Sequence, residues 1–504
     1  MATPSTTVYD LVIVGGGSAG LTAAKLAGKT LKKSTLIIEA DRLGGDCTWT
    51  GCVPSKSLLA KAKAAQMARR FAIQTNKNNN NQVPVVDFVQ VKDYFEKNQQ
   101  DIYDRDDSPS ALAEYNVDTM QGLATVTSSK TVQVSQQQQQ QEPSTTTTTT
   151  TTTITAKQGI ILCTGATAKM ADIPGLNDVQ VVTYEDIWRL ESLPKRLTVV
   201  GGGPVGIELA QAMSRLGCQV TIVATQLLPR EEPEVSSVLE DVFRNDEGIT
   251  IVSGRLEKVE RNNGTGGHKA FVSCVTPPGQ VATVEGDVLL LSVGRKPNTK
   301  GLGLEIMGIG LTDNGGILVN DKLQTSVKGI YAAGDCIGEK QFTHYAGYQG
   351  AIAARNILLP LSDPGVLRDI PATTFTSPEV ASVGYSEASA KKEFGDDAVV
   401  VSKMDLSEVD RAVCDGETKG FLKVIYKKRG GKILGATIVA PVAGELICEI
   451  VVAMKAGMSF PDLAKAIHPY PSYAIALQIM ASEAYYENVG KYRVVYDFLK
   501  RLGL

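Results

Sequence analysis

The sequence predicts an α/β protein of several domains, in which two similar βαβ units precede a domain of different character. The 504 residues are too many for one hydrophobic core. An apolar run followed by a glycine-rich turn occurs twice, beginning near Tyr9 and again near Leu197. From about Pro371, strand-like and helix-like segments alternate without such a turn. This change predicts a third, α+β domain.

The first βαβ unit has the pattern of a dinucleotide-binding fold. Residues 9–14 form a continuous apolar run, typical of a buried parallel strand, and residues 15–20 match G-x-G-x-x-G. A helix is expected from Leu21 to about Ala27, and a second strand at residues 35–38 ends in Glu39. In this pattern Gly15 makes the tight turn, Gly17 admits a pyrophosphate, Gly20 permits close helix packing, and Glu39 accepts from a ribose hydroxyl. The unit therefore predicts a Rossmann-like domain.

The same pattern returns at residues 197–223. A strand at 197–200 leads into a second G-x-G-x-x-G, with glycines at Gly201, Gly203 and Gly206, then a helix and another strand. A duplicated fold with one inactive copy is the alternative to two bound dinucleotides. Two dinucleotides are favoured because every element of the unit is present twice.

The second unit ends its second strand differently from the first. Ala224, Thr225 and Gln226 stand where an acid would hold the 2′-hydroxyl of NAD and repel the 2′-phosphate of NADP. The missing acid favours NADPH over NADH. No arginine occupies these three positions, and Arg230 is the nearest one that follows.

Two cysteines, Cys47 and Cys52, are separated by four residues and followed by Pro54 and a helix-like run at 57–64. Proline suits the first turn of a helix, and a helix N-terminus favours a thiolate. We interpret the pair as a redox-active dithiol. A metal site would need a second Cys/His cluster, and the three histidines are scattered. A structural disulfide would be unusual without a secretion signal.

Composition excludes several classes of function. A net charge of −3 and a pI near 5.9 give no basic surface for nucleic acid or an anionic membrane. The eight cysteines are widely spread, as expected of reduced, intracellular thiols. No uncharged apolar run is long enough to span a bilayer, and the N-terminus shows no leader. We therefore expect a cytoplasmic protein without membrane or nucleic-acid partners.

Low-complexity tracts interrupt the first domain. An Asn-rich stretch lies at residues 76–82. Residues 121–126 and 130–134 alternate like hairpin strands, whose tip is enlarged by Gln- and Thr-rich tracts within 135–155. Such tracts bury little apolar surface, so both insertions are predicted to be unfolded surface loops.

Taken together, these motifs resemble the FAD-dependent pyridine nucleotide–disulfide oxidoreductases of class I, which include glutathione reductase, dihydrolipoamide dehydrogenase and mercuric reductase. The resemblance covers about residues 9–486, apart from the insertions. Its further motifs are a Gly-Arg-Lys-Pro-Asn run at 294–298, an Ala-Gly-Asp turn at 333–335 and His468-Pro469. The sequence around the cysteines, together with residues 229–231 and 410–413, looks most like the mercuric-reductase-like branch.

The resemblance implies bound FAD, a nicotinamide nucleotide with NADP(H) favoured over NAD(H), and no metal site. FAD is expected at Gly15, Gly17, Gly20, Glu39 and Asp335. Further cofactor-binding residues are expected at these positions: Gly45, Lys56, Gly122, Ala124, Thr164, Gly165, Glu208, Gly294 and Arg295. The nicotinamide nucleotide is expected at Gly201, Gly203 and Gly206.

The resemblance also implies catalytic roles. Lys56 and Glu208 match an ion pair beside the flavin, which stabilises negative charge on it. Cys52 matches the thiol that stays against the flavin, and Cys47 the thiol that attacks the substrate. His468 matches a general acid–base that the second subunit of a homodimer supplies.

Three departures from the family bear on the substrate. Tyr473 stands where disulfide reductases usually carry a Glu that orients the histidine, so His468 is expected to be oriented differently or to be less basic. Pro204 and Ser55 differ from the residues of glutathione reductases. Mercury is disfavoured because the chain ends in Arg-Leu-Gly-Leu, without a vicinal cysteine pair.

The sequence thus predicts an NAD(P)H-dependent flavoprotein that reduces a small disulfide, or a quinone or metal ion, through Cys47 and Cys52. The alternatives are a dihydrolipoamide dehydrogenase, a mercuric-ion or quinone reductase, and a non-catalytic flavoprotein redox sensor. The expected domains are FAD-binding (1–175), NAD(P)-binding (176–293), a return to the FAD or central domain (294–365), and dimerisation (366–504).

Overall fold

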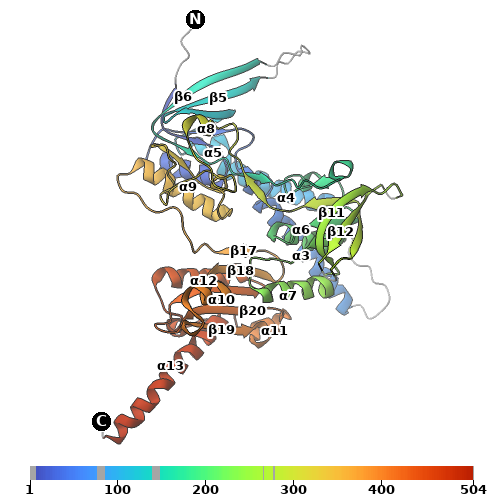
Figure 1. Cartoon of the computed structure of the whole chain (residues 1–504), viewed down its shortest axis with the longest axis vertical. Helices are drawn as coiled ribbons and strands as arrows, with labels where there is room; N and C mark the ends of the chain where they lie inside the picture. Colours follow the sequence, from blue (N-terminus) through green and yellow to red (C-terminus); the bar gives the residue numbers. More distant parts are fainter. Residues whose placement is uncertain (1–6, 76–85, 139–147, 265, 276–277, 503–504) are drawn as a thin grey trace. The chain divides into compact units, whose positions relative to one another are not determined.

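A computed structural model describes residues 7–75, 86–138, 148–264, 266–275 and 278–502 (Figure 1). It divides into two compact units, each built from separate stretches of the chain. Unit 1 comprises Met1–Asp172, Val181–Leu193 and Leu290–Leu367, and unit 2 comprises the remainder. Among the described residues no helix is both long and apolar enough to cross a membrane. The Asn-rich stretch lies outside the described residues.

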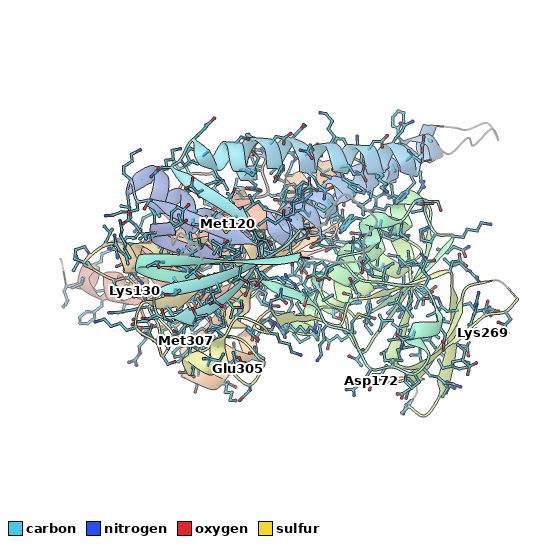
Figure 2. All side chains as sticks on the ribbon, turned by 90° about the horizontal axis from the view of Figure 1, so that it is seen from above. Met120, Lys130, Asp172, Lys269, Glu305 and Met307 are labelled. Carbon is cyan, nitrogen blue, oxygen red and sulfur yellow. The ribbon has the colours of Figure 1, made fainter. Side chains whose placement is uncertain are left out.

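Unit 1 is built on one seven-stranded sheet, in the order β3-β2-β1-β6-β5-β4 with β16 also paired to β6. The central pairs β1–β2 and β1–β6 are parallel, as expected for a Rossmann-like fold. Met120 on β3 and Lys130 at the β4–β5 turn can be located on this sheet in Figure 2. The strands are β1 (Thr7–Val14), β2 (Thr35–Glu39), β3 (Val117–Gln121), β4 (Leu123–Ser128), β5 (Thr131–Gln138), β6 (Thr148–Leu162) and β16 (Ile330–Ala332).

The fully buried apolar residues of β1, β2 and β6 form the core of unit 1. Helix α9 packs closely on α1, because a Cβ at Gly350 would lie 2.0 Å from the carbonyl oxygen of Ala19. A two-stranded ribbon joins β7 (Ala166–Ala168) to β15 (Arg295–Pro297). The helices of unit 1 are α1 (Ser18–Lys25), α2 (Gly45–Trp49), α3 (Cys52–Thr75), α4 (Phe88–Ile102), α5 (Pro109–Ala113), α8 (Leu304–Met307) and α9 (Thr343–Leu358).

The Gln- and Thr-rich tracts depart from the prediction. Gln136–Gln138 and Thr148–Thr153 continue the antiparallel β5–β6 pairing, from Gln136↔Thr150 to Gln138↔Thr148. The prediction of a wholly unfolded insertion is therefore wrong for these residues. The ladder requires main-chain hydrogen bonds and not apolar burial, and threonine is β-branched and suits a strand. Residues 139–147 lie outside the described part.

Unit 2 contains the second βαβ unit and the C-terminal sheet. In the first sheet of this unit the strands run in the order β13-β12-β11-β10-β9-β14. The second glycine turn joins β9 to α6. Its elements are β9 (Arg196–Val200), α6 (Pro204–Leu216), β10 (Gln219–Ala224), α7 (Pro233–Asp241), β11 (Thr250–Arg261), β12 (His268–Cys274), β13 (Val281–Gly286) and β14 (Val288–Leu291).

The C-terminal part of unit 2 is an antiparallel sheet in the order β17-β18-β21-β20-β19, with its own apolar core. Helix α12 is one of the helix-like segments that were expected after about Pro371. The elements are β17 (Ala372–Thr374), β18 (Glu379–Gly384), α10 (Glu387–Phe394), β19 (Val399–Asp405), α11 (Asp410–Asp415), β20 (Phe421–Lys427), β21 (Ile433–Ala440), α12 (Ala443–Ala456) and α13 (Ile475–Arg501).

Candidate active site

The two cysteines lie at the start of adjacent helices in unit 1. Cys47 is in the five-residue helix α2, and Cys52 is the first residue of the 24-residue helix α3. Pro54 occupies the first turn of α3, as predicted. The N-terminus of α3 carries partial positive charge, which stabilises a thiolate at Cys52.

The two thiols contact each other, and hydroxyl groups surround them. The hydrogen bond with Cys52, burial and the negative charge of Cys52 raise the pKa of Cys47, while the hydroxyls of Thr343 and Ser18 oppose this rise. The sulfur of Cys52 lies 3.1 Å from the Thr343 hydroxyl. Ser18 belongs to the first glycine fingerprint, and Thr343 begins α9. The dithiol therefore lies directly beside the predicted FAD fingerprint.

Residues between the cysteines are bound to neighbouring segments of unit 1. The Thr48 hydroxyl donates to Asp107 at 2.8 Å, and the Trp188 indole N–H donates to the carbonyl of Thr50 at 2.9 Å. The Trp49 indole N–H donates to the Leu43 carbonyl at 2.7 Å. The guanidinium carbon of Arg42 lies 3.1 Å from the centre of the Trp49 ring. Trp49 thus packs on the protein.

Arg295 links this loop to the predicted FAD residue Asp335. It forms an ion pair with Asp46, directly before Cys47, and another with Asp335 at 2.5 Å. Its Nε donates to the Tyr184 hydroxyl at 3.0 Å, and that hydroxyl donates to Asp46 at 3.1 Å. Although burial opposes it, the surrounding acids and Tyr184 raise the pKa of Arg295. Sequence reasoning placed Arg295 at the cofactor but missed its partners Asp46 and Tyr184.

The first glycine fingerprint fits a pyrophosphate. Gly15 has φ +106°, and a Cβ there would lie 2.2 Å from the carbonyl of Cys163, so only glycine fits. The space above Gly17 is open, because a Cβ there would meet nothing nearer than 3.9 Å. The Glu39 carboxylate accepts from the Gly16 N–H at 2.6 Å, at the end of β2. These residues form a cradle whose donors and acid suit FAD.

The other residues of unit 1 that were predicted to bind a cofactor lie near this cradle or on the ribbon. The Gly122 N–H donates to the Glu39 carbonyl at 2.8 Å, and Ala124 follows on β4. Thr164 and Gly165 bind Asn298, through Thr164 Oγ1 to the Asn298 carbonyl and through the Asn298 N–H to the Gly165 carbonyl. The other residues are Gly45 at the start of α2, Lys56 on α3, and Gly294 before β15.

The second fingerprint has the same local geometry. Gly201 has φ +119°, its N–H donates to the Val223 carbonyl, and the space above Gly203 is open. Gly206 is buried within α6. Glu208, also buried in α6, accepts from the Phe375 N–H at 2.8 Å. Lys56 belongs to unit 1 and Glu208 to unit 2, so their pairing stays a prediction.

His468 lies in unit 2, on the loop before α13. Its Nε2 lies 2.9 and 3.0 Å from the two carboxylate oxygens of Glu449 on α12. Burial opposes protonation, but Glu449 and the Ala466 carbonyl raise the pKa of His468. Of the two effects expected from Tyr473, a different orientation agrees with this contact, because a carboxylate distant in sequence binds the imidazole, whereas a lower pKa does not agree with it. The sequence signal for this residue was that Glu449 is a single acid within an otherwise apolar stretch at 446–452.

Two family models match the chain. Residues 9–350 match "Pyridine nucleotide-disulphide oxidoreductase", and residues 370–481 match the dimerisation domain of the same family. The chain belongs to the pyridine nucleotide-disulphide oxidoreductase family. The predicted family, fold class and oxidoreductase function, with FAD and a pyridine nucleotide, are confirmed.

The chain is similar to relatives of more than one activity. A mercuric reductase of Streptomyces lividans is 34% identical over 493 residues, covering 96% of this chain and 98% of that protein. A dihydrolipoyl dehydrogenase of Mycoplasma pneumoniae is 31% identical over 487 residues, covering 95% and 99%. The HOCl-induced flavoprotein disulfide reductase RclA of Escherichia coli, solved as a Cu(II) complex, has a TM-score of 0.79 and 26% identity, covering 95% and 99%.

Proposed function

We propose that the protein is a homodimeric, NADPH-dependent flavoprotein reductase that passes electrons through Cys47 and Cys52 to a small disulfide. The observation that carries this proposal is the position of the dithiol beside Ser18 of the FAD fingerprint and Thr343 of α9. Bound FAD would supply a carrier that takes a hydride from the nicotinamide and delivers two electrons to the dithiol. The two cysteines, Ser18 and Thr343 all belong to unit 1.

The two cysteines have different roles in this proposal. The position of Cys52 at the N-terminus of α3 supports its role as the thiolate that stays on the flavin side. Cys47 keeps its proton beside a charged Cys52, so it needs a base before it can attack a disulfide. His468 of a second subunit is the proposed base, and the matched dimerisation domain supports a dimer.

The preference for NADPH rests on the end of β10. Ala224 is buried there, and Thr225 and Gln226 follow it, so no acid of this segment repels a 2′-phosphate. Arg230 is exposed and lines a hollow with Ser382 and Tyr385. We therefore assign the preference to the missing acid and not to an arginine contact.

A metal ion is the second candidate acceptor. Two adjacent thiols are soft ligands, and the names of similar proteins include mercuric reductase and a Cu(II) complex. Across the described ranges, no group of three or more His, Cys, Asp or Glu side chains is arranged to hold a metal. The dithiol is accordingly the proposed contact for such an ion, which would be substrate and not a resident cofactor.

Anaerobic titration of the FAD-loaded protein with NADPH tests the electron path. We expect a long-wavelength charge-transfer band after two electrons, from the Cys52 thiolate against oxidised flavin. C47S should keep its FAD and lose disulfide turnover, while C414S, at an exposed cysteine of α11, should behave as wild type. Disulfide turnover that survives in C47S would contradict the proposal, as would flavin bleaching without the band. A panel of disulfides and of Hg(II) and Cu(II) then separates the two acceptors.

The coenzyme preference is a separate prediction. With FAD saturating, kcat/KM for NADPH is expected to exceed that for NADH by about tenfold or more, because no acid at the end of β10 repels the 2′-phosphate. A glutamate at position 224 should restore that repulsion. A224E is expected to reverse the preference. Equal values for both coenzymes in the wild type would contradict the argument from β10.

A further inference from the structure

The contacts of the His468 imidazole assign its protons. Nδ1 lies 2.8 Å from the main-chain carbonyl of Ala466, and a carbonyl only accepts. Nδ1 therefore carries a proton in every charge state of the ring. Nε2 faces both carboxylate oxygens of Glu449, so it carries the second proton whenever that carboxylate is ionised. Nε2 is thus the nitrogen whose proton can be exchanged.

The surroundings hold the ring in this position. The His468 side chain is only 10% exposed, and the Glu449 side chain is 27% exposed. The His468 N–H donates to Gln478 of α13 at 2.9 Å. An ion pair that is largely screened from solvent is stronger than one on the surface.

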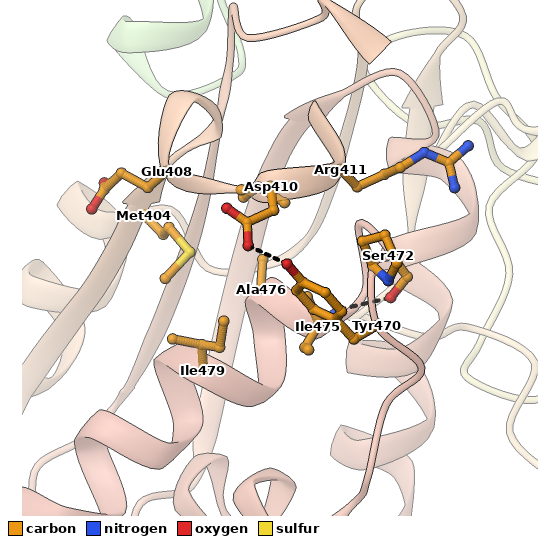
Figure 3. A pocket seen from close by; sticks show the side chains of 11 residues that line it. Met404, Glu408, Asp410, Arg411, Tyr470, Ser472, Ile475, Ala476 and Ile479 are labelled. Atoms are coloured by element: carbon orange, nitrogen blue, oxygen red, sulfur yellow. Dashed lines mark hydrogen bonds between the residues drawn. The ribbon is translucent and has the colours of Figure 1, made fainter. Parts of the chain in front are cut away.

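Tyr473 has no carboxylate, and its side chain packs in the core. It is 8% exposed, and its hydroxyl donates to Asp415 of α11 at 2.9 Å. Nearby, Tyr470 donates to Asp410 at 2.8 Å, at the hollow shown in Figure 3. The loop after His468 is therefore bound to α11 at two points, while the imidazole itself is bound to α12.

We propose that Glu449 is the positioning residue of His468, a carboxylate from α12 that replaces the family glutamate absent at position 473. This inference rests on the proposed disulfide reduction for its role in catalysis. Glu449 holds the imidazole by Nε2 and keeps it protonated, so that the charged ring is ready as an acid. The contact between Glu449 and the imidazole does not depend on which disulfide is the substrate.

The proton balance of the step follows from these assignments. The proton of the Cys47 thiol is held on Nε2 of His468, as the imidazolium beside Glu449, and the Cys47 thiolate attacks the substrate disulfide, so that one S–S bond forms and one breaks. The leaving thiolate takes the proton back from Nε2. The Cys52 thiolate then attacks the mixed disulfide, which forms the Cys47–Cys52 disulfide and releases the second product as a thiolate that takes its proton from solvent. Glu449 stays ionised and stabilises the imidazolium between the two transfers.

Other charged groups near the ring do not replace Glu449. α13 contributes the neutral amide of Gln478, and the loop itself contributes the Ala466 carbonyl. On the 3₁₀ turn before the loop, Lys465 pairs with Asp462 at 2.9 Å. On α11, Asp410 and Asp415 bind Tyr470 and Tyr473.

NMR titration of the ring protons tests the contact without any substrate. The chain has only three histidines, so H468Q assigns the signal. We expect E449Q to lower the pKa of His468 by about one unit, the usual effect of an adjacent charge. E449D should give an intermediate value, and E445Q, at an exposed position of the same helix, should match wild type. A wild-type pKa in folded E449Q would overturn the proposal.

Steady-state kinetics test the catalytic consequence. In E449Q the alkaline limb of kcat/KM for the disulfide should move to lower pH by the same interval, with KM for NADPH unchanged. Faster turnover in E449Q would overturn the proposal, because it would mean that Glu449 keeps the histidine away from the reacting thiols. If the wild type reduces no disulfide while the NMR shift is found, the proposed function fails and the assignment of Glu449 as the partner that keeps His468 protonated stands.

Discussion

At the scale of single residues, Arg295 joins the predicted cofactor site to the dithiol. Its guanidinium binds Asp335, Asp46 and Tyr184, with one further contact to the Ala166 carbonyl. Arginine suits this place because its planar fork of donors can satisfy several acceptors at once. The position of the helix that carries Cys47 therefore depends on a residue 249 positions away in the chain.

We expect D46N to loosen α2 without unfolding unit 1. Asp46 is 41% exposed, so losing its charge should cost only about 1 kcal/mol of unfolding free energy, measured with urea. Misplacement of Cys47 should lower kcat for the disulfide by about tenfold.

Two measurements control this prediction. FAD content should stay unchanged in D46N, because the glycine cradle is intact. D172N, at an exposed position that can be located in Figure 2, should leave both stability and kcat as in wild type. An unchanged kcat in D46N would contradict this prediction, because the position of α2 would then not depend on the Asp46–Arg295 ion pair.

At the scale of elements, periodicity and glycine spacing predicted both βαβ units, because a buried parallel strand and a tight turn leave strong local patterns. The observed strands β1 and β2 contain the predicted ones. Long-range partners had no such pattern. Thr343 and Glu449 each meet a functional residue through tertiary packing, so spacing could not identify them.

In the β5–β6 hairpin, the sequence predicted less structure than the chain has. Composition indicated an unfolded tract, yet Thr148–Thr153 are paired with β5. Hydrophobicity measures what a segment can bury, whereas a strand can also be extended by main-chain hydrogen bonds from an existing ladder. Low-complexity threonine beside a formed strand is therefore compatible with regular structure.

At the scale of the whole molecule, the C-terminal part of unit 2 has the surface of a subunit interface. Large apolar side chains are exposed on α12, α13 and the loop between them, among them Val452, Ile479 and Ile467, the last 92% exposed. Exposed apolar groups of this size are typical of surfaces that a partner covers. His468 lies on the same loop as Ile467, which supports its use by a second subunit.

Subunit complementation tests whether the dimer builds the site. C47S and H468Q homodimers should both be nearly inactive toward the disulfide. A purified heterodimer of the two variants contains one site with an intact Cys47 and an intact His468 from different subunits, so it should recover about half of wild-type activity. The matched control is a heterodimer of C47S and C52S, in which each dithiol lacks one sulfur and no activity should return. A C47S/H468Q heterodimer as inactive as its parents would mean that each subunit must supply its own histidine.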